Sequence, residues 1–222
     1  MANPVNLRLY ALVDPGRDGG HALPELARAV VAGGATLVQL RDKAGSTRRM
    51  VETARAIRAA IAGSGVPLLI NDRVDVALAS GADGVHVGWD DMTVEDARRL
   101  LGPKAIIGLS INSEQRARAA PLAMLDYVAV GGVYATMSKD NPNAPKGIGG
   151  AKALADIVRA RAPKLPIGAI AGIDAENAAA VMAAGFDGVA VISALSITPD
   201  PAAAARALRG VVDAAARERT LA

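Results

Sequence analysis

Cysteine is absent from this chain of 222 residues, and aromatic residues make up only 2 % of it. Without cysteine, the chain has neither disulfide bonds nor a thiolate nucleophile. With one Phe, one Trp and three Tyr, it lacks the aromatic platforms on which nucleic-acid bases stack. Its two histidines, His21 and His86, have no His-x-x-x-His or Glu-x-x-His spacing, which argues against a zinc site.

Long hydrophobic runs and charge of one sign are also missing. The formal net charge is only +3, and the basic residues are scattered along the sequence as pairs such as Arg48-Arg49 and Arg98-Arg99. We therefore expect no nucleic-acid partner. The amino terminus lacks the charged start and apolar core of a signal peptide, and no apolar stretch is long enough to span a membrane. These features predict a cytoplasmic protein without a membrane partner.

Short aliphatic runs alternate with segments of helical spacing, and hydrophobic residues make up 51 % of the chain. Strands buried on both faces read as continuous apolar runs. The sequence predicts an α/β fold, a single (β/α)8 TIM barrel that spans residues 1–222 as one domain. A doubly wound sheet is the alternative, weakened by the absence of a G-x-G-x-x-G fingerprint and a P-loop. The predicted strands are 7–13, 37–40, 68–71, 84–87, 106–110, 127–131, 167–170 and 188–192, and the predicted helices 23–32, 47–62, 74–80, 94–101, 113–120, 151–162, 175–184 and 202–216.

Polar residues follow most of these strands. In a (β/α)8 barrel the catalytic groups lie at the carboxyl ends of the strands, so such residues converge on one face. This polarity favours an enzyme over a passive scaffold. The residues at these positions are Asp14, Gln39, Arg41, Asp42, Lys43, Asn71, Asp72, Asp90, Asp91, Ser110, Thr136, Ser138, Lys139, Gly172 and Ser193.

Two aspartates after neighbouring strands predict a metal site. Asp72 follows the third strand and Asp91 the fourth, so their carboxylates can meet at one point. Two oxygen ligands from side chains suit Mg²⁺, which keeps several waters and binds substrate phosphates. The alternative is that Asp72 and Asp90 cap the following helices. The sequence does not separate Asp90 from Asp91.

Cations and small residues at the same strand ends predict two phosphate sites. Arg41, Lys43 and Lys139 can neutralise a pyrophosphate, although each alone is more often a solvated surface charge. The small-residue stretches 168–173 and 191–194 allow a phosphate to approach the backbone. Close packing of strand on helix explains those stretches equally well.

Taken together and in order, these motifs resemble those of the thiamine-phosphate synthase family. The resemblance covers nearly the whole chain. It rests on Gln39-Leu40-Arg41-Asp42-Lys43, Ile70-Asn71-Asp72, Gly84-Val85-His86-Val87-Gly88 followed by Asp90-Asp91, Gly108-Leu109-Ser110, Thr136 through Lys139, Ala171-Gly172-Ile173 and Ile192-Ser193-Ala194.

The resemblance implies a Mg²⁺-dependent transferase that joins 4-amino-2-methyl-5-hydroxymethylpyrimidine diphosphate to a thiazole phosphate and releases pyrophosphate. It implies catalytic roles for Arg41, Lys43, Ser110 and Lys139, metal binding by Asp72 and Asp91, and a homodimer. The residues expected to bind these small-molecule substrates are Gln39, Leu40, Arg41, Asp42, Lys43, Asn71, Ser110, Thr136, Met137, Ser138, Lys139, Gly172, Ile192 and Ser193.

Two alternative functions share the same barrel. A thiazole tautomerase-like isomerase resembles the synthase but uses a histidine after the sixth strand, where this chain has Gly132. A non-catalytic phosphate-ligand sensor would bind without turnover. The chain also departs from the family at Trp89, where glutamine is common, so the role of Trp89 is open.

Overall fold

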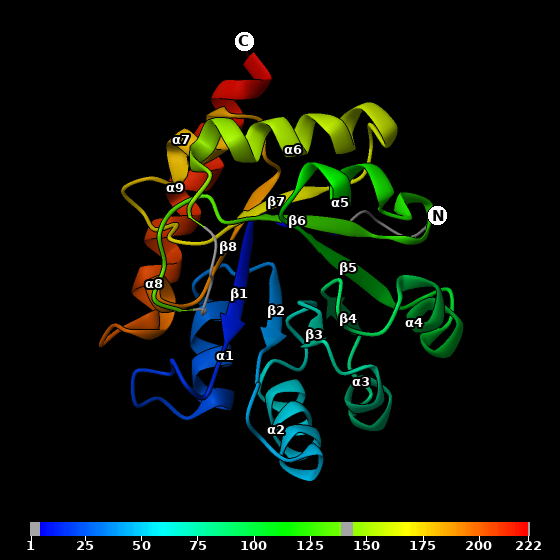
Figure 1. Cartoon of the computed structure of the whole chain (residues 1–222). Helices are drawn as coiled ribbons and strands as arrows, with labels where there is room; N and C mark the ends of the chain where they lie inside the picture. The colour runs from blue at the N-terminus through cyan, green and yellow to red at the C-terminus, as the bar shows by residue number, and fades with distance from the viewer. Residues whose placement is uncertain (1–4, 139–143, 222) are drawn as a thin grey trace.

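Eight parallel strands form a closed barrel in this computed structural model, which describes residues 5–138 and 144–221 (Figure 1). Each strand pairs with the next along the chain, and β8 pairs with β1. The prediction of a (β/α)8 barrel is therefore confirmed, and the doubly wound alternative is wrong. The strands are β1 (Leu9–Val13), β2 (Leu37–Leu40), β3 (Leu68–Asn71), β4 (Gly84–Val87), β5 (Ile106–Ile111), β6 (Tyr127–Gly131), β7 (Ile167–Ile170) and β8 (Gly188–Val191).

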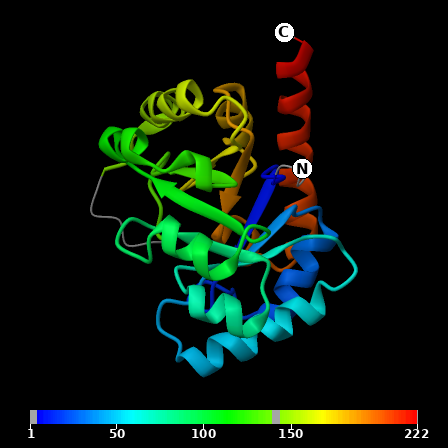
Figure 2. The same ribbon diagram turned by 90° about the vertical axis from the view of Figure 1, so that its right-hand side faces the viewer.

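Helices surround the barrel, and the longest, α9, extends past the strands (Figure 2). α6 begins at Gly147, earlier than the predicted start at residue 151. The prediction missed this first turn because glycine has low intrinsic helix propensity. The last predicted helix, 202–216, corresponds to α9, which is longer, and the short α8 before it was not predicted. No helix among the described residues combines the length and hydrophobicity needed to cross a membrane. The helices are α1 (Leu23–Ala32), α2 (Thr47–Ala60), α3 (Val74–Ser80), α4 (Val94–Leu101), α5 (Glu114–Ala119), the 3₁₀ helix η1 (Leu122–Met124), α6 (Gly147–Arg161), α7 (Ala178–Ala183), α8 (Ser193–Ser196) and α9 (Pro201–Leu221).

Strand residues alternate between the barrel interior and the surrounding helices. On β1, Tyr10 and Leu12 belong to the interior cluster, whereas Leu9 and Val13 pack in the larger cluster under the helices. Both faces are buried, which explains why the strand sequences show no polar alternation. The same alternation decides which residues at the strand ends face the barrel mouth.

Glycines at the starts of two strands let the barrel walls approach closely. A Cβ atom on Gly84 would lie 1.8 Å from the carbonyl oxygen of Ile106, and one on Gly188 would lie 1.6 Å from that of Leu7. These obstacles are backbone atoms of neighbouring strands, which cannot rotate away. The sheet therefore requires glycine at both positions.

We expect Gly84→Ala and Gly188→Ala each to lower the free energy of unfolding by about 2 kcal/mol or more, because the methyl group forces paired strands apart. The matched control is Gly210→Ala in α9, where an added Cβ meets nothing within 4 Å. That change should raise stability by about 0.5 to 1 kcal/mol, since alanine is the better helix former. Urea denaturation of the three variants measures both effects. A stability of Gly188→Ala equal to that of the unaltered protein would contradict the packing argument.

Candidate active site

A cavity of about 480 Å³ opens at the carboxyl ends of the strands. Loops after several strands and residues inside the barrel contribute to its walls. Of the residues expected from the sequence, those that line it are Gln39, Arg41, Asn71, Ser110, Thr136, Met137, Ser138, Gly172, Ile192 and Ser193.

The structure does not bring Leu40 and Asp42 into this cavity. Leu40 is buried in the core under the helices, on the outward side of β2. The Asp42 carboxylate accepts hydrogen bonds from the backbone N–H groups of Ala44 and Gly45, so it holds the turn before α2. Strand alternation explains the position of Leu40, and the turn explains that of Asp42, so neither position requires a bound ligand. Lys139 lies outside the described residues.

Lys43, Asp72 and Asp91 form a charged cluster beyond the residues that line the cavity. The Lys43 ammonium pairs with the Asp72 carboxylate. Burial, followed by a hydrogen bond that the Asp91 carboxyl donates to the neighbouring Asp72 carboxylate, raises the pKa of Asp91, although the Gly88 N–H donates to Asp91 at 2.7 Å. Asp72 has a φ of 63°, in the left-handed region that aspartate tolerates better than most residues. Two carboxylates held this close favour a cation between them.

Asp90 and Asp91 have different surroundings, although they are adjacent in sequence. The Asp90 side chain is 97 % exposed, and its nearest cation is Arg116 at 4.0 Å. The Asp91 side chain instead turns toward Asp72 and the Gly88 N–H. Of the two carboxylates that the sequence left open, the structure therefore places Asp91 beside Asp72.

Arg41 is held by Asp14, an acid that the sequence placed at a strand end without predicting its role or partner. Its guanidinium pairs with Asp14, which lies after β1 and is buried. The Gly16 N–H also donates to this carboxylate at 2.8 Å. The position of Asp14 at a strand end was the available signal, but its partner lies 27 residues away. The pair fixes the direction of Arg41 and leaves further guanidinium donors for a ligand.

A buried hydrogen-bond network forms the floor of the cavity. The Tyr10 and Tyr127 hydroxyls lie 2.8 Å apart, and Gln39 donates to Tyr10. His86 bridges Tyr127, 2.8 Å from Nδ1, and the Ser110 hydroxyl, 2.9 Å from Nε2. His86 thus has the interior hydrogen-bonding role expected from its place within a strand. The two tyrosines carried no sequence signal, because their contact joins β1 to β6.

Asn71 is the described residue with a buried side-chain nitrogen that lacks a hydrogen-bond partner. Its amide lies on the cavity wall at the end of β3. An unpaired buried donor costs about 1 to 3 kcal/mol, so a ligand acceptor at this position would be stabilising.

The opposite wall comes from the loops after β6, β7 and β8. The Ser138 and Ser193 hydroxyls lie 3.1 Å apart, and the Ser138 N–H donates to the Thr136 hydroxyl at 3.1 Å. Gly172 has a φ of 66°, and a Cβ there would lie 2.3 Å from the carbonyl oxygen of Ala135. Only glycine allows these two loops to meet. These positions are polar and uncharged, whereas Asp174, which also lines the cavity, accepts hydrogen bonds from the Glu176 and Asn177 N–H groups.

Trp89 lies beside Ser110 at the mouth. Its indole N–H donates to the Ser110 carbonyl at 3.0 Å, and the Arg116 guanidinium lies 5.6 Å from its ring centre. These contacts link the loop after β4 to the end of β5. Trp89 therefore supports the strand that presents Ser110.

Comparisons with known proteins agree on one family. A family model described as "Thiamine monophosphate synthase" matches residues 9–195. A thiamine-phosphate synthase of Agrobacterium fabrum is 54 % identical over 98 % of this chain and 99 % of its own length, and one of Chloroflexus aurantiacus is 46 % identical over 96 % and 95 %.

Solved structures agree with these relatives. A thiamine phosphate pyrophosphorylase from Pyrococcus furiosus superposes with a TM-score of 0.82 at 34 % identity, over 95 % of this chain and 98 % of that one. A 3-hexulose-6-phosphate synthase, at 19 % identity and a TM-score of 0.65 over 92 % and 99 % of the two chains, shares the fold alone.

The tyrosine pair predicts a loss of stability above pH 10. Burial raises the pKa of the Tyr10 and Tyr127 hydroxyls well above their usual value, so both stay neutral in the folded protein. In the unfolded chain they ionise near pH 10, and each then lowers stability by about 1.4 kcal/mol per pH unit. Below pH 10 both states are protonated and the pair has no effect.

Urea denaturation at pH 8, 10 and 11 measures this loss. The Tyr10→Phe/Tyr127→Phe variant should start less stable at pH 8 but lose about 2 to 3 kcal/mol less by pH 11. An identical pH dependence in the variant and the unaltered protein would show that the tyrosines are not the titrating groups.

Proposed function

Because this chain belongs to the thiamine monophosphate synthase family, we propose that its cavity joins an aminopyrimidine diphosphate to a thiazole phosphate. The activity is that of thiamine-phosphate synthase, a transferase of thiamine biosynthesis. The observation that carries the assignment of the site is the Lys43, Asp72 and Asp91 cluster beside a cavity whose opposite wall presents the hydroxyls of Thr136, Ser138 and Ser193. One wall suits a pyrophosphate, and the other suits a monophosphate bound by hydroxyl and backbone groups.

The diphosphate would bind to Arg41 and Lys43. Arg41 lines the cavity with its direction fixed by Asp14, and a guanidinium can bind two phosphate oxygens at once. The Lys43 side chain is 53 % exposed and can exchange Asp72 for phosphate. The role of Lys139 rests on the family resemblance, since the residue is not described.

Asp72 and Asp91 would hold Mg²⁺. The residues fit this ion, because both offer hard oxygen ligands and Asp72 already raises the pKa of Asp91. Among the described residues, no three acidic, histidine or cysteine side chains lie close enough together to hold a metal ion. Water and substrate oxygens would therefore complete the coordination. When bound, the ion neutralises the charge that develops on the pyrophosphate.

The aminopyrimidine would face Gln39, Asn71 and Ser110. All three line the cavity near its floor, and the unpaired Asn71 amide offers a donor for a ring nitrogen or a phosphate oxygen. His86 orients the Ser110 hydroxyl from below. The tyrosine and histidine network would thus position the ring without exchanging protons with it.

The thiazole phosphate would bind at the opposite wall. The Thr136, Ser138 and Ser193 hydroxyls offer donors, and the backbone of Gly172 and Ile192 lies open to close approach. Met137 lies at the rim with 85 % of its surface exposed, where it would contact a bound substrate.

The reaction needs alignment more than a strong base. The 4-amino group donates electron density toward the exocyclic methylene, so the C–O bond breaks and the pyrophosphate leaves with the electron pair. The thiazole nitrogen then donates its lone pair to that carbon and becomes the thiazolium. Arg41 and Lys43 would stabilise the leaving group, and the two walls would align the rings. The tautomerase alternative lacks its histidine at Gly132, and the sensor alternative predicts no pyrophosphate release.

We expect Asp72→Asn and Asp91→Asn each to lower turnover by about a hundredfold or more, because both remove charge from the metal site. The matched control, Asp90→Asn, should keep near-normal turnover, since its side chain points into solvent. The assay is pyrophosphate release with both substrates and Mg²⁺. Full activity of Asp91→Asn with loss in Asp90→Asn would transfer the metal role to Asp90, and no release by the unaltered protein would reject the synthase activity.

Lys43→Ala should lower kcat/KM for the diphosphate substrate by about ten- to a hundredfold, since a charged hydrogen bond is worth roughly 1.5 to 3 kcal/mol. The KM for the thiazole phosphate should change less than about twofold. Stability should stay within about 1 kcal/mol, because exposed ion pairs contribute little. Lys152→Ala, which removes a similarly exposed lysine that pairs with Asp156 on α6, is the control and should leave kinetics unchanged. Equal effects on the KM of both substrates would contradict a specific role at the diphosphate.

A further inference from the structure

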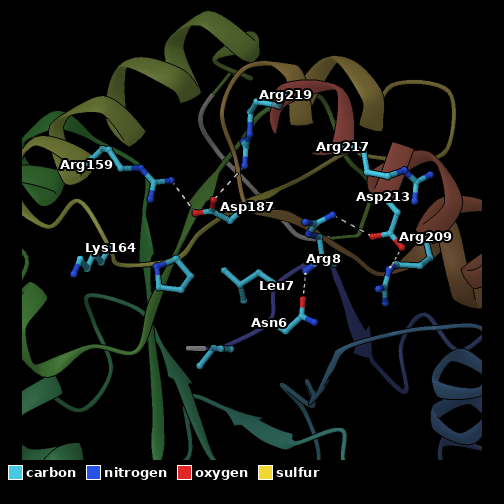
Figure 3. A pocket seen from close by; sticks show the side chains of 12 residues that line it. Asn6, Leu7, Arg8, Arg159, Lys164, Asp187, Arg209, Asp213, Arg217 and Arg219 are labelled. Atoms are coloured by element: carbon cyan, nitrogen blue, oxygen red, sulfur yellow. Dashed lines mark hydrogen bonds and ion pairs between the residues drawn. The ribbon is translucent and has the colours of Figure 1, made fainter. Parts of the chain in front are cut away.

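A second cavity, of about 570 Å³, lies at the opposite end of the barrel. It is an open depression lined by the segments that precede β1, β7 and β8, by Arg159 of α6 and by the carboxyl-terminal part of α9 (Figure 3). Its acidic residues are Asp187 and Asp213. Its cations are Arg8, Arg159, Lys164, Arg209, Arg217 and Arg219.

This cavity holds the positive charge of the molecule. Its six cations and two acids give it a net charge of +4, whereas the whole chain carries only +3. The remainder of the chain is therefore slightly negative. Cations that are scattered in the sequence converge here, which composition and spacing did not reveal.

Asp187 pairs with two arginines, of which Arg219 also donates to the backbone carbonyls of Phe186 at 2.6 Å and Met182 at 3.4 Å. A similar arrangement occurs two strand–helix units earlier in the barrel, where Asp126 accepts from the Ile107 N–H at 2.8 Å and pairs with Arg98 at 2.7 Å. Asp187 likewise accepts from the Ile167 N–H at 2.9 Å and pairs with Arg159 at 2.8 Å. One arginine completes this arrangement at Asp126. Asp187 has a second, Arg219, at 3.5 Å.

Asp213 is likewise shared by two arginines. Arg209 pairs with it at 2.8 Å within α9, and Arg8 pairs with it at 3.2 Å from the segment before β1. Each carboxylate therefore neutralises one of two adjacent guanidinium groups. Arg8 makes one side-chain hydrogen bond among those identified in the described residues, which leaves further donors available.

Lys164 and Arg217 are exposed, and neither side chain has a hydrogen bond or ion pair with any residue that the structure describes. They lie on opposite sides of the cavity, Lys164 beside Arg159 and Arg217 beside Asp213 (Figure 3). Arg217 follows Arg209 and Asp213 at four-residue intervals, so all three share one face of α9. These two cations are free to bind a ligand and contribute nothing visible to the fold.

We propose that this cavity binds a small polyanion that carries at least two phosphate groups. Its volume lies in the range of ligand pockets, and its cations surround a concave space instead of following an extended track. No aromatic side chain lines it, so nucleic-acid bases would find no stacking surface. A compact polyphosphate matches both the shape and the charge.

Calorimetric titration with inorganic tripolyphosphate tests the site. The full chain carries Lys43→Ala, which weakens phosphate binding at the other end of the barrel, and Mg²⁺ is omitted. Adding Lys164→Glu/Arg217→Glu should weaken binding at least tenfold. The matched control is Arg28→Glu/Arg206→Glu, which reverses two exposed charges outside the cavities and should change affinity less than twofold. Melting temperatures should agree among the variants, because all four residues are exposed.

Three results would overturn the proposal. Equal weakening by both double variants would mean that the phosphate responds only to overall charge, and no weakening by Lys164→Glu/Arg217→Glu would place the binding elsewhere. Displacement of tripolyphosphate by a single-stranded RNA that binds more tightly would assign the surface to nucleic acid. On an otherwise unaltered chain, Lys164→Glu/Arg217→Glu should keep normal pyrophosphate release, so failure of this site leaves the catalytic assignment intact.

Discussion

Closure of the sheet between β8 and β1 is the constraint on which the site depends. Closure fixes all eight strands in one direction and brings their carboxyl ends to a single opening. Charged residues that are far apart in sequence, such as Arg41 and Asp14, then become neighbours. The cost of closure is close backbone approach, which only glycine permits at Gly84 and Gly188. The arrangement of residues at the carboxyl ends of the strands thus depends on glycine at the starts of two strands.

The parts of the fold that follow from local pattern were predictable. Apolar runs bounded by turns located every strand to within two residues, and the polar residues that end those strands located most of the cavity. Alternation along the strand could also have excluded Leu40, because it has the parity of Val38 and not of Gln39. The turn formed by Asp42 is a common local motif that competes with a binding role.

The rest depends on contacts between distant segments, which a single sequence does not report. The Tyr10 and Tyr127 hydroxyls meet across 117 positions, and the choice between Asp90 and Asp91 depends on how the loop after β4 folds toward Asp72. The basic cavity is the clearest case, since its cations come from three parts of the chain. These cations are far apart in the sequence, and the fold of the barrel brings them together.

The interior cluster that contains Tyr10 and Tyr127 also divides the molecule into two compartments. Leu7, at one end of this cluster, lines the cavity that carries the six cations, and Tyr10, toward the other end, lines the cavity at the carboxyl ends of the strands. A packed interior between them leaves no passage for a ligand or a chain of water molecules. Ligands at the two ends therefore cannot compete by direct contact. Any influence of one on the other must pass through the strands themselves, as a small shift of β1, β7 or β8 along the barrel wall.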